Sequence, residues 1–582
     1  MNVAQQIINY LEKIGVKHIF TVVGGGAIFL NDAIRQSNIQ PIFCLHEQAA
    51  AIAAEAYAQA GGIGVVLVTT GPGVTNSLTG VAGAYLESTP VLIISGQVNT
   101  FHSNTPDGPR QIGFQEVNTK SLVTPIVKTY SKLTSGNDAE EKLHKLLAEM
   151  KKGRPGPVWF DIPLDIQNAE VEGDIQISKT KKYQYNQTTI YEGIAKNHIL
   201  NSLNKAKRPV CLLGNGVRLA GVEKEVIEFL RVNNIPTLCT WKTFDMFTED
   251  DPIYFGRPGI VASRYANKIQ QESDLILCLG ARMDLGQVAF SYENFAPHSH
   301  KIIIDVSNEE LKKWDGIDNV CTYCCDLSFF SSASSNYLKK SKSWSWWLEH
   351  CLSLKKKYNL DKERECNSID KDHLYNYTFY NMLPVLAKYI TNHDVIVHGS
   401  SGSCSEMTCQ ALKLYNKTRV IGTHGLGSMG FGVPAAIGAY FATHKHIICI
   451  EGDGSLAMNM QELELIHRYS LPINIFVINN NGYASIRNTQ DKFFDGNWFG
   501  SSPSVGLTLP NYQNIAKAFN LSYVSVSKPN ELKSILQHHK WPTIIELYVD
   551  MFKVRSYPRT FTKMVDGKIT TMPMDQLWPE RE

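Results

Sequence analysis

Short apolar runs alternate with amphipathic stretches along most of this chain, and the apolar runs are rich in Val and Ile. Such runs predict strands that are buried on both faces, and the stretches between them predict helices. This alternation is typical of parallel α/β sheets. The clearest predicted strands are Val65–Thr69, Val91–Ser95, Val158–Asp161, Val210–Leu213, Leu275–Leu279, Ile302–Val306, Val395–Val397, Ile447–Glu451 and Ile473–Ile478.

The predicted strands gather into three segments, so we expect an α/β protein of three doubly wound parallel-sheet domains. The length of 582 residues agrees with this division, because domains average roughly 150 residues. Polar stretches at 178–189 and 341–367 read as linkers, and residues 553–582 as a tail or lid. The expected domains span residues 1–165, 190–345 and 376–552.

The chain begins with an amphipathic pattern rather than a targeting signal. Apolar residues recur at helical spacing at Val3, Ile7, Ile8, Leu11 and Ile14, with no basic start, apolar core and small-residue cleavage site. No stretch approaches the ~20 apolar residues that a membrane span needs. We therefore expect a cytoplasmic protein without a membrane partner.

Charge and cysteine content narrow the function classes further. The formal net charge is +2 and the basic residues form no stripe, so no nucleic-acid partner is expected. Twelve cysteines are too sparse for a disulfide scaffold in a chain of this length. Cys321, Cys324 and Cys325 have metal-like spacing, but a zinc site would need a second pair, and none lies at a recognised distance. We expect ordinary reduced thiols.

Polar clusters follow two predicted strands of the third domain. The segment Gly452–Ser455 (GDGS) follows one strand, and Asn479–Gly482 (NNNG) follows the next. Open α/β sheets bind ligands at the carboxyl ends of their strands. An Asp and an Asn at this edge offer hard oxygen ligands to Mg²⁺, and the metal can bridge to phosphate oxygens. The glycines let the backbone approach phosphates, and a following helix N-terminus favours negative charge.

Two further segments have simple structural interpretations when taken alone. Glu47 opens a predicted alanine-rich helix, and an acidic residue there complements the helix dipole. The glycine-rich stretch Gly422–Gly432 precedes a small-residue helix, which indicates a tight loop and close helix packing.

The pair GDGS and NNNG resembles the signature of thiamine diphosphate-dependent enzymes. This resemblance implies thiamine diphosphate and Mg²⁺ as cofactors, with the metal bound by Asp453, Asn480 and the backbone of Gly482. It also implies that Glu47 hydrogen-bonds the pyrimidine ring and promotes its imino tautomer, which removes the thiazolium C2 proton. A carboxyl in a dry pocket has a raised pKa and can share a proton with a ring nitrogen.

The same resemblance implies the remaining site residues. Met429 would wedge beneath the cofactor, and the carbonyl of Gly427 would accept from the cofactor's amino group. The other implied cofactor-binding residues are Pro72, Asn76, Ser401, Gly402, Ser403, Cys404, Gly452, Gly454, Ser455 and Tyr483. The implied catalytic residues beside Glu47 are Gly25, Gly26 and Gln115.

Nearly the whole chain resembles the acetohydroxyacid (acetolactate) synthases within this group. The similar segments include TTGPGVTNSLTGVAGAYLESTPVLIISGQV, GRPGPVWFDIP and GLGSMGFGVPAAIGA. Such enzymes decarboxylate pyruvate, a 2-keto acid, and pass the two-carbon unit to a second carbonyl. They have pyrimidine, middle and diphosphate domains, and the active site lies between domains of two subunits. The resemblance therefore implies a homodimer or homotetramer in which Glu47 and Asp453 meet across an interface.

Two positions depart from the synthase pattern. Where those synthases carry a Trp that shapes the acceptor pocket, this chain has Thr489, and where they carry an Arg for the acceptor carboxylate, it has Gly286. The loop 23–32 and the segment MVDGKITTMPMDQLWP instead resemble enzymes of bacterial surface-sugar clusters, which add the two-carbon unit to a ketone on a nucleotide sugar. Phe114, Gln115, Glu116 and Lys128 remain as in the synthases. A nucleotide-sugar ketone and a 2-keto acid both stay open as acceptors.

The middle domain raises the question of a flavin. Glycine-rich segments at 214–216 and 280–282, with Asp305, stand where related synthases hold FAD, and Arg282 is the best candidate for a contact with it. The alternative is a domain kept for assembly alone. A redox-active FAD would make the protein a pyruvate oxidase. A non-catalytic homologue would lack Glu47, Asp453 or Asn480, and all three are present.

Overall fold

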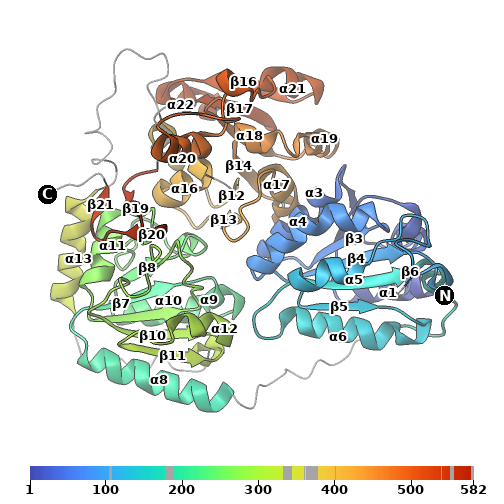
Figure 1. Cartoon of the computed structure of the whole chain (residues 1–582), viewed down its shortest axis with the longest axis horizontal. Coiled ribbons are helices and arrows are strands. Elements are labelled where there is room, and N and C mark those ends of the chain that lie inside the picture. Colours follow the sequence, from blue (N-terminus) through green and yellow to red (C-terminus); the bar gives the residue numbers. More distant parts are fainter. Residues whose placement is uncertain are drawn as a thin grey trace. The chain divides into compact units, whose positions relative to one another are not determined.

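The computed structural model describes residues 1–103, 108–176, 188–331, 344–359, 361, 378–399, 402–538, 540–550 and 556–578. These residues contain three wholly parallel sheets with helices packed on their faces (Figure 1). The expected α/β fold class is therefore confirmed. The predicted linker 178–189 lies largely outside the described residues, whereas most of 341–367 is described and contains a helix, Ser345–Lys357.

The chain forms two compact units. One consists of Met1–Lys182, His393–Ser405 and Arg419–Phe552 and holds the first and third sheets. The other consists of Tyr183–Asn392, Glu406–Thr418 and Lys553–Glu582 and holds the middle sheet.

The first sheet has the strand order β2-β1-β3-β4-β6-β5. Its strands are β1 (His18–Thr21), β2 (Gln40–Phe43), β3 (Gly64–Val68), β4 (Val91–Gln97), β5 (Thr129–Lys132) and β6 (Val158–Pro163). The helices of this segment are α1 (Val3–Lys13), α2 (Ile28–Arg35), α3 (Glu47–Gln59), α4 (Pro72–Leu86), α5 (Thr119–Val123), α6 (Ala139–Lys151) and α7 (Leu164–Gln167). The amphipathic start of the chain is α1, whose N-terminus is closed by a capping box between Asn2 and Gln5.

The middle sheet has the order β11-β10-β9-β7-β8. Its strands are β7 (Pro209–Leu213), β8 (Thr237–Cys239), β9 (Leu275–Leu279), β10 (His300–Asp305) and β11 (Val320–Cys324). The helices of this segment are α8 (Thr188–Lys205), α9 (Gly216–Leu219), α10 (Glu223–Val232), α11 (Arg264–Glu272), α12 (Asn308–Leu311), α13 (Ser345–Lys357) and α15 (Phe379–Ala387).

The third sheet has the order β13-β12-β14-β15-β17-β16. Its strands are β12 (Asp394–His398), β13 (Arg419–Ile421), β14 (His446–Gly452), β15 (Ile473–Asn479), β16 (Ser522–Val526) and β17 (Thr543–Tyr548). The helices are α16 (Gly402–Ala411), α17 (Gly432–Thr443), α18 (Asp453–Leu456), α19 (Leu463–Arg468), α20 (Ala484–Phe494), α21 (Tyr512–Ala518) and α22 (Pro529–His538). A 3₁₀ turn, Met460–Glu462, leads directly into α19.

Helices α3 and α17 pack directly against each other and join the first and third sheets into one core (Figure 1). The contact is close because both helices present small residues. A Cβ atom added at Gly438 of α17 would lie 2.0 Å from the carbonyl oxygen of Ala53 in α3. On another side of α3, a Cβ atom at Gly80 of α4 would lie 2.5 Å from the Cβ of Ala51. Helix α3 is thus packed closely between α17 on one side and α4 on another.

Residues 556–578 form two short antiparallel pairs, β18 (Arg559–Thr560) with β21 (Leu577–Trp578) and β19 (Thr562–Val565) with β20 (Lys568–Thr571). They pack on α11 of the middle-sheet unit. The buried side chains of Arg264 and Asn267 donate to the carbonyls of Leu577 (2.8 Å) and Met574 (2.7 Å).

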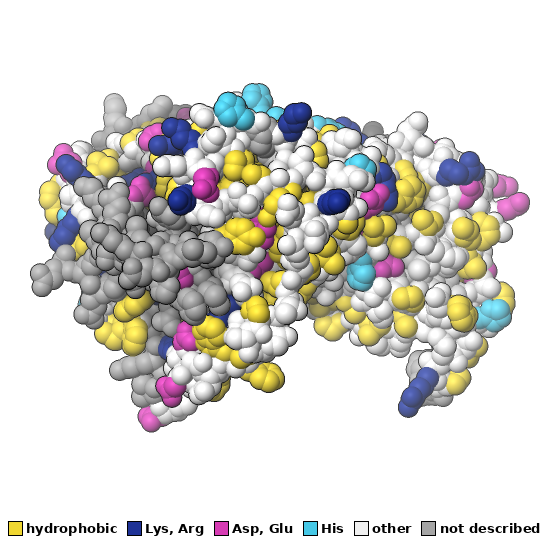
Figure 2. Space-filling model, turned by 90° about the horizontal axis from the view of Figure 1, so that it is seen from above, with side chains coloured by type: hydrophobic (Ala, Val, Ile, Leu, Met, Phe, Trp, Pro, Cys, Tyr) yellow, Lys and Arg dark blue, Asp and Glu magenta, His cyan; other side chains and the backbone are white. Residues whose placement is uncertain are grey.

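The surface carries mixed charge. On the face shown in Figure 2, basic and acidic side chains of the described residues are interspersed, without a broad patch of one sign. No helix among the described residues is long and apolar enough to cross a bilayer.

Candidate active site

Two loops meet at the carboxyl ends of β14 and β15. The strands pair in register up to Gly452 and Ile478, so the loops that follow them lie side by side. One oxygen of the Asp453 carboxylate accepts from the backbone N–H groups of Asn480 (3.1 Å) and Gly482 (3.0 Å). The other accepts from the N–H of Gly454 (2.8 Å). The structure therefore brings together the three residues expected to bind a metal.

The Asp453 side chain is buried, with 2% of the residue exposed. Burial raises the pKa of Asp453 to about 6, and the hydrogen bonds from Gly482, Gly454 and Asn480 oppose this rise. A buried carboxylate is stabilised by a bound cation. The carboxylate, the amide oxygen of Asn480 and the Gly482 carbonyl are oxygen ligands of the kind that Mg²⁺ prefers, so these residues fit a divalent metal with a diphosphate.

Arg487 of α20 orients the Asn480 side chain, and the sequence alone did not single it out. Its guanidinium is buried and donates to the Asn480 side-chain oxygen (3.0 Å), the Asn480 carbonyl (2.8 Å) and the Ser501 carbonyl (2.8 Å). This fork fixes both the loop backbone and the amide. Tyr512 of α21 also donates to the carbonyl of Asp453.

The glycine-rich segment 422–432 is fastened to the GDGS loop. The N–H of Gly430 donates to the hydroxyl of Ser455 (2.8 Å), and the side chain of Asn459 donates to the Gly430 carbonyl (2.8 Å). Gly427 has a φ of +63°, a left-handed conformation that favours glycine. Met429 directly precedes Gly430, so the hydrogen bonds of Gly430 also restrict the backbone at Met429.

The two glycines of GDGS have different surroundings. A Cβ atom at Gly452 would meet nothing within 4 Å, so this position is open enough for a ligand to approach. A Cβ atom at Gly454 would lie 2.3 Å from the ring of Tyr483 and 3.4 Å from the terminal methyl of Met429. Packing by Tyr483 is therefore sufficient to require glycine at 454.

Glu451, immediately before this loop, is a second buried carboxyl that sequence reasoning missed. It accepts from the N–H of Gly432 (2.7 Å), the first residue of α17. Burial raises the pKa of Glu451 to about 7. The residue thereby links the strand that carries Asp453 to the helix that packs on α3.

Glu47 is the first residue of α3 and is buried, with 8% of the residue exposed. The preceding residue, His46, caps the helix because its Nδ1 accepts from the N–H of Gln48 (3.1 Å). The side-chain amide of Asn76 in α4 donates to one Glu47 oxygen (3.0 Å). Pro72, the first residue of α4, is exposed.

The loop before Glu47 is bonded to the third-sheet layer. The N–H of Leu45 donates to both oxygens of Glu462 (3.1 and 3.3 Å). Glu462 is fully buried, and burial raises its pKa to about 7. A second carboxylate makes a similar contact, since Glu87 accepts from the N–H of His424 (2.6 Å). Both contacts join elements far apart in sequence, and neither carries a motif.

Solvent exposure differs among the three other implied catalytic residues, Gly25, Gly26 and Gln115. Gly25 is exposed and a Cβ atom there would meet nothing within 4 Å. Gly26 is enclosed, because a Cβ atom there would lie 2.1 Å from the Thr70 hydroxyl. Gln115 is exposed, has a φ of +63°, and its carbonyl oxygen lies 2.2 Å from a Cβ atom built at Gly71.

The residues at the start of α16 are described in part. Gly402 has a φ of +61°, and a Cβ atom there would lie 2.0 Å from the hydroxyl of Ser485. The buried thiol of Cys404 donates to the Ile450 carbonyl (3.4 Å). Ser401 and the side chain of Ser403 lie outside the described residues.

The glycine-rich turns of the middle sheet pack on each other. A Cβ atom at Gly214 would lie 2.2 Å from the Gly280 carbonyl, and one at Gly216 would lie 2.7 Å from the Gly280 Cα. Close backbone packing is thus sufficient to require these glycines. Arg282 is partly buried and forms an ion pair with Asp284 (2.7 Å).

Comparison with known proteins matches three segments of the chain to domains of one enzyme family. Residues 1–122, 197–322 and 400–547 match the N-terminal TPP binding, central and C-terminal TPP binding domains of "thiamine pyrophosphate enzyme". The chain is 31% identical to the acetolactate synthase isozyme 2 large subunit of Escherichia coli, over 92% of this chain and 93% of that protein. It is 30% identical to the acetolactate synthase large subunit of Lactococcus lactis, over 94% and 92%.

Proposed function

Because the chain belongs to the thiamine pyrophosphate enzyme family, we propose that it uses thiamine diphosphate with Mg²⁺ to decarboxylate pyruvate and to join the two-carbon unit to a carbonyl acceptor. The observation that carries this proposal is the buried Asp453 carboxylate, which accepts from the N–H groups of Asn480 and Gly482. The first, middle and third sheets would form the pyrimidine-binding, middle and diphosphate-binding domains.

In this proposal Asp453, Asn480 and the Gly482 carbonyl hold Mg²⁺, and the metal holds the diphosphate. Arg487 fixes the orientation of the Asn480 amide by donating to its side-chain oxygen at 3.0 Å. Gly452 leaves room for the diphosphate, and Met429 and Gly427 support the cofactor rings. Bound thiamine diphosphate supplies the electron sink that loss of CO₂ from a 2-keto acid requires.

Glu47 is the proposed proton-transfer residue. Its residue is buried, with 8% exposed, and the bond from Asn76 limits the rotation of the carboxyl. A buried carboxyl in a fixed orientation can hold a proton against a ring nitrogen of the cofactor. The exposed residues Gly25 and Gln115 would face the substrate.

We further propose that Glu47 and Asp453 of one active site come from different subunits of a homodimer or homotetramer. Mixing two inactive variants tests this directly. If Glu47→Gln and Asp453→Ala chains are refolded together, a mixed dimer has one site with both native residues, and activity returns. Activity that stays absent after mixing, while each variant exchanges subunits with wild type, would refute the shared site.

The acceptor we propose is a ketone without a carboxylate, as on a nucleotide sugar. Thr489 lies exposed on α20 and Gly286 lacks a side chain, so neither supplies the ring or the cation that a small 2-keto acid acceptor would use. The second candidate is a 2-keto acid, which would make the protein an acetolactate synthase. It is favoured by the similarity to acetolactate synthase large subunits over more than nine-tenths of the chain.

Product analysis separates the two acceptors. The protein is incubated with thiamine diphosphate, Mg²⁺ and pyruvate, with and without simple ketones. A tertiary alcohol formed from the ketone supports the first acceptor, and acetolactate alone supports the second. A chain that neither consumes pyruvate nor forms either product would contradict the proposed function.

We also propose that the protein binds FAD near Arg282 and that this FAD has no redox role. The purified protein would then show the visible absorbance of a flavin. Reduction of an artificial electron acceptor in the presence of pyruvate would instead favour a pyruvate oxidase. Arg282→Ala removes the candidate contact and should therefore weaken flavin binding.

A further inference from the structure

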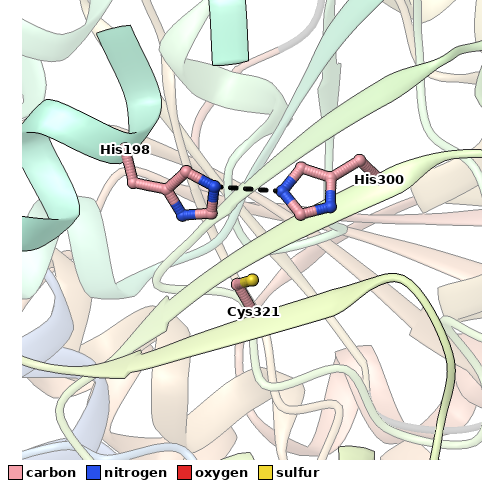
Figure 3. Close-up of side chains that lie close together, drawn as sticks. All are labelled: His198, His300 and Cys321. Carbon is pink, nitrogen blue, oxygen red and sulfur yellow. Dashed lines mark hydrogen bonds between the residues drawn. The ribbon is translucent and has the colours of Figure 1, made fainter. Parts of the chain in front are cut away.

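Three side chains with metal-binding atoms converge in the middle-sheet unit, far from the residues of the proposed active site in sequence. They are His198 of α8, His300 of β10 and Cys321 of β11 (Figure 3). One nitrogen of each ring and the thiol sulfur all lie within 4.8 Å of one another.

The sheet register explains why two of the three share a face. Ile302 pairs with Cys321 across β10 and β11. Because side chains alternate along a strand, His300 points to the same face as Ile302 and therefore as Cys321. Helix α8 covers this face and places His198 above the two strands (Figures 1 and 3).

The nitrogen spacing suits a shared ion. The Nε2 atoms of His198 and His300 are 3.2 Å apart. Two nitrogens that each bind one zinc ion at about 2.0–2.1 Å, at the tetrahedral angle, are about 3.3 Å apart. A direct hydrogen bond between the rings also fits this distance, but it gives no role to Cys321, whose sulfur faces the same space.

Both rings are held from behind, as metal-binding histidines usually are. The Nδ1 atom of His198 is 2.7 Å from the hydroxyl of Tyr323, which lies on the Cys321 face of β11. His300 forms a hydrogen bond with the backbone of Asn319, just before β11. The two rings present their Nε2 atoms toward each other. All three candidate ligands are partly exposed, so an ion can enter from solvent.

The other two cysteines of the CTYCC segment do not take part. Cys324 is exposed and its sulfur contacts the Val306 carbonyl (3.6 Å) on the opposite face of β11. The described cysteines are all free thiols. The sequence led us to expect ordinary reduced thiols in this segment, and its spacing gave no sign that Cys321 lies beside histidines from two other elements.

We propose that His198, His300 and Cys321 form a binding site for a zinc ion, with water in the fourth position. Two imidazole nitrogens and one thiolate suit a borderline-soft divalent ion such as Zn²⁺ rather than Mg²⁺. The ion would link α8 to the edge strand β11 and to its neighbour β10. This site is independent of the proposed active site, whose metal ligands are oxygens.

Cobalt titration of the full-length protein tests the site, because Co²⁺ bound to a thiolate gives a near-ultraviolet charge-transfer band. The protein is first reduced and saturated with Mg²⁺. We expect one strongly absorbing Co²⁺ per chain, displaced by Zn²⁺. The band should disappear in Cys321→Ser and His300→Asn and persist in the matched control Cys324→Ser. No band in the wild type, or a band that survives Cys321→Ser, would overturn the proposal.

Alkylation of the unaltered chain gives a test that does not depend on the folding of variants. Iodoacetamide labelling at Cys321 and Cys324 is followed by mass spectrometry of the peptide that contains both. Zn²⁺ should slow labelling of Cys321 at least tenfold and leave the exposed Cys324 unchanged. Equal labelling rates of Cys321 with and without Zn²⁺ would refute the site.

Discussion

Replacing Gly438 by alanine tests the packing that joins the first and third sheets. The added Cβ atom would lie 2.0 Å from the Ala53 carbonyl oxygen, at least about 1 Å closer than such atoms approach in folded proteins. The obstacle is backbone of α3, so no side-chain rotation relieves it. Helices α3 and α17 must move apart, and α3 carries Glu47 at its first position.

The expected magnitude follows from two opposing terms. Alanine in place of glycine inside a helix stabilises by about 1 kcal/mol. Overpacking against a fixed backbone costs about 3 kcal/mol, the upper end of the usual range. The net effect of Gly438→Ala is therefore a destabilisation of about 2 kcal/mol. The matched control is Gly193→Ala in α8, where the new Cβ meets nothing within 4 Å and only the helix term remains, about 1 kcal/mol of stabilisation.

Hydrogen exchange with peptide-level resolution is the appropriate assay, because a chain with two compact units need not unfold in one step. Gly438→Ala should accelerate exchange in α3 and α17, whereas Gly193→Ala should slow exchange in α8. If Gly438→Ala leaves exchange in α3 and α17 unchanged or slows it, the close contact with Ala53 does not exist.

Three further changes address the candidate site. Glu47→Gln should lower turnover by about two to four orders of magnitude, the contribution of positioned proton transfer, while the cofactor still binds, because glutamine can keep the bond from Asn76. Asp453→Ala should abolish Mg²⁺-dependent binding of thiamine diphosphate in a titration. Burial raises the pKa of Glu462 from its ordinary 4.5 to about 7, so the folded state binds more protons than the unfolded state between these values. Wild-type stability should therefore fall, relative to Glu462→Gln, by up to about 3 kcal/mol as the pH rises from about 4.5 to 7.

Each of these outcomes has a clear contrary result. Unimpaired turnover of Glu47→Gln would remove the proton-transfer role, and unchanged cofactor affinity of Asp453→Ala would remove the metal site. For Glu462, parallel pH–stability curves of wild type and variant would mean that the carboxyl is ionised in the folded state at pH values where we expect it to be protonated. Glu451 is present in both proteins and cancels in that comparison.

The nine strands named from the sequence could be predicted because each is a short, nearly continuous apolar run, whereas strands with more polar residues, such as β2 and β5, were not predicted. The predicted strand Leu275–Leu279 is β9, and the predicted runs around Ile447 and Ile473 are β14 and β15, extended by one residue or none at each end. Asp453 and Asn480 could be found for the same reason, since both lie directly after such runs. The meeting of their loops then follows from the parallel pairing of neighbouring strands.

Residues that act through long-range contacts could not be predicted. Glu462 looks like an ordinary helical acid in the sequence, and only folding brings it to the N–H of Leu45. Arg487 lies in a polar helix whose pattern does not distinguish it from a surface cation. The glycines illustrate the converse: the sequence indicated room for phosphate at Gly454, whereas the ring of Tyr483 occupies the space beside it.

The alanine-rich sequence of α3 determines how precisely Glu47 is positioned. Helices α4 and α17 pack closely against Ala51 and Ala53, so there is no space at these positions for a larger side chain. The small side chains of α3 thus have a structural role. They allow the close packing that fixes the position of the helix and the direction of the Glu47 side chain at its N-terminus. A small change such as Ala53→Val, midway along the helix, would therefore shift the Glu47 carboxyl at its first position.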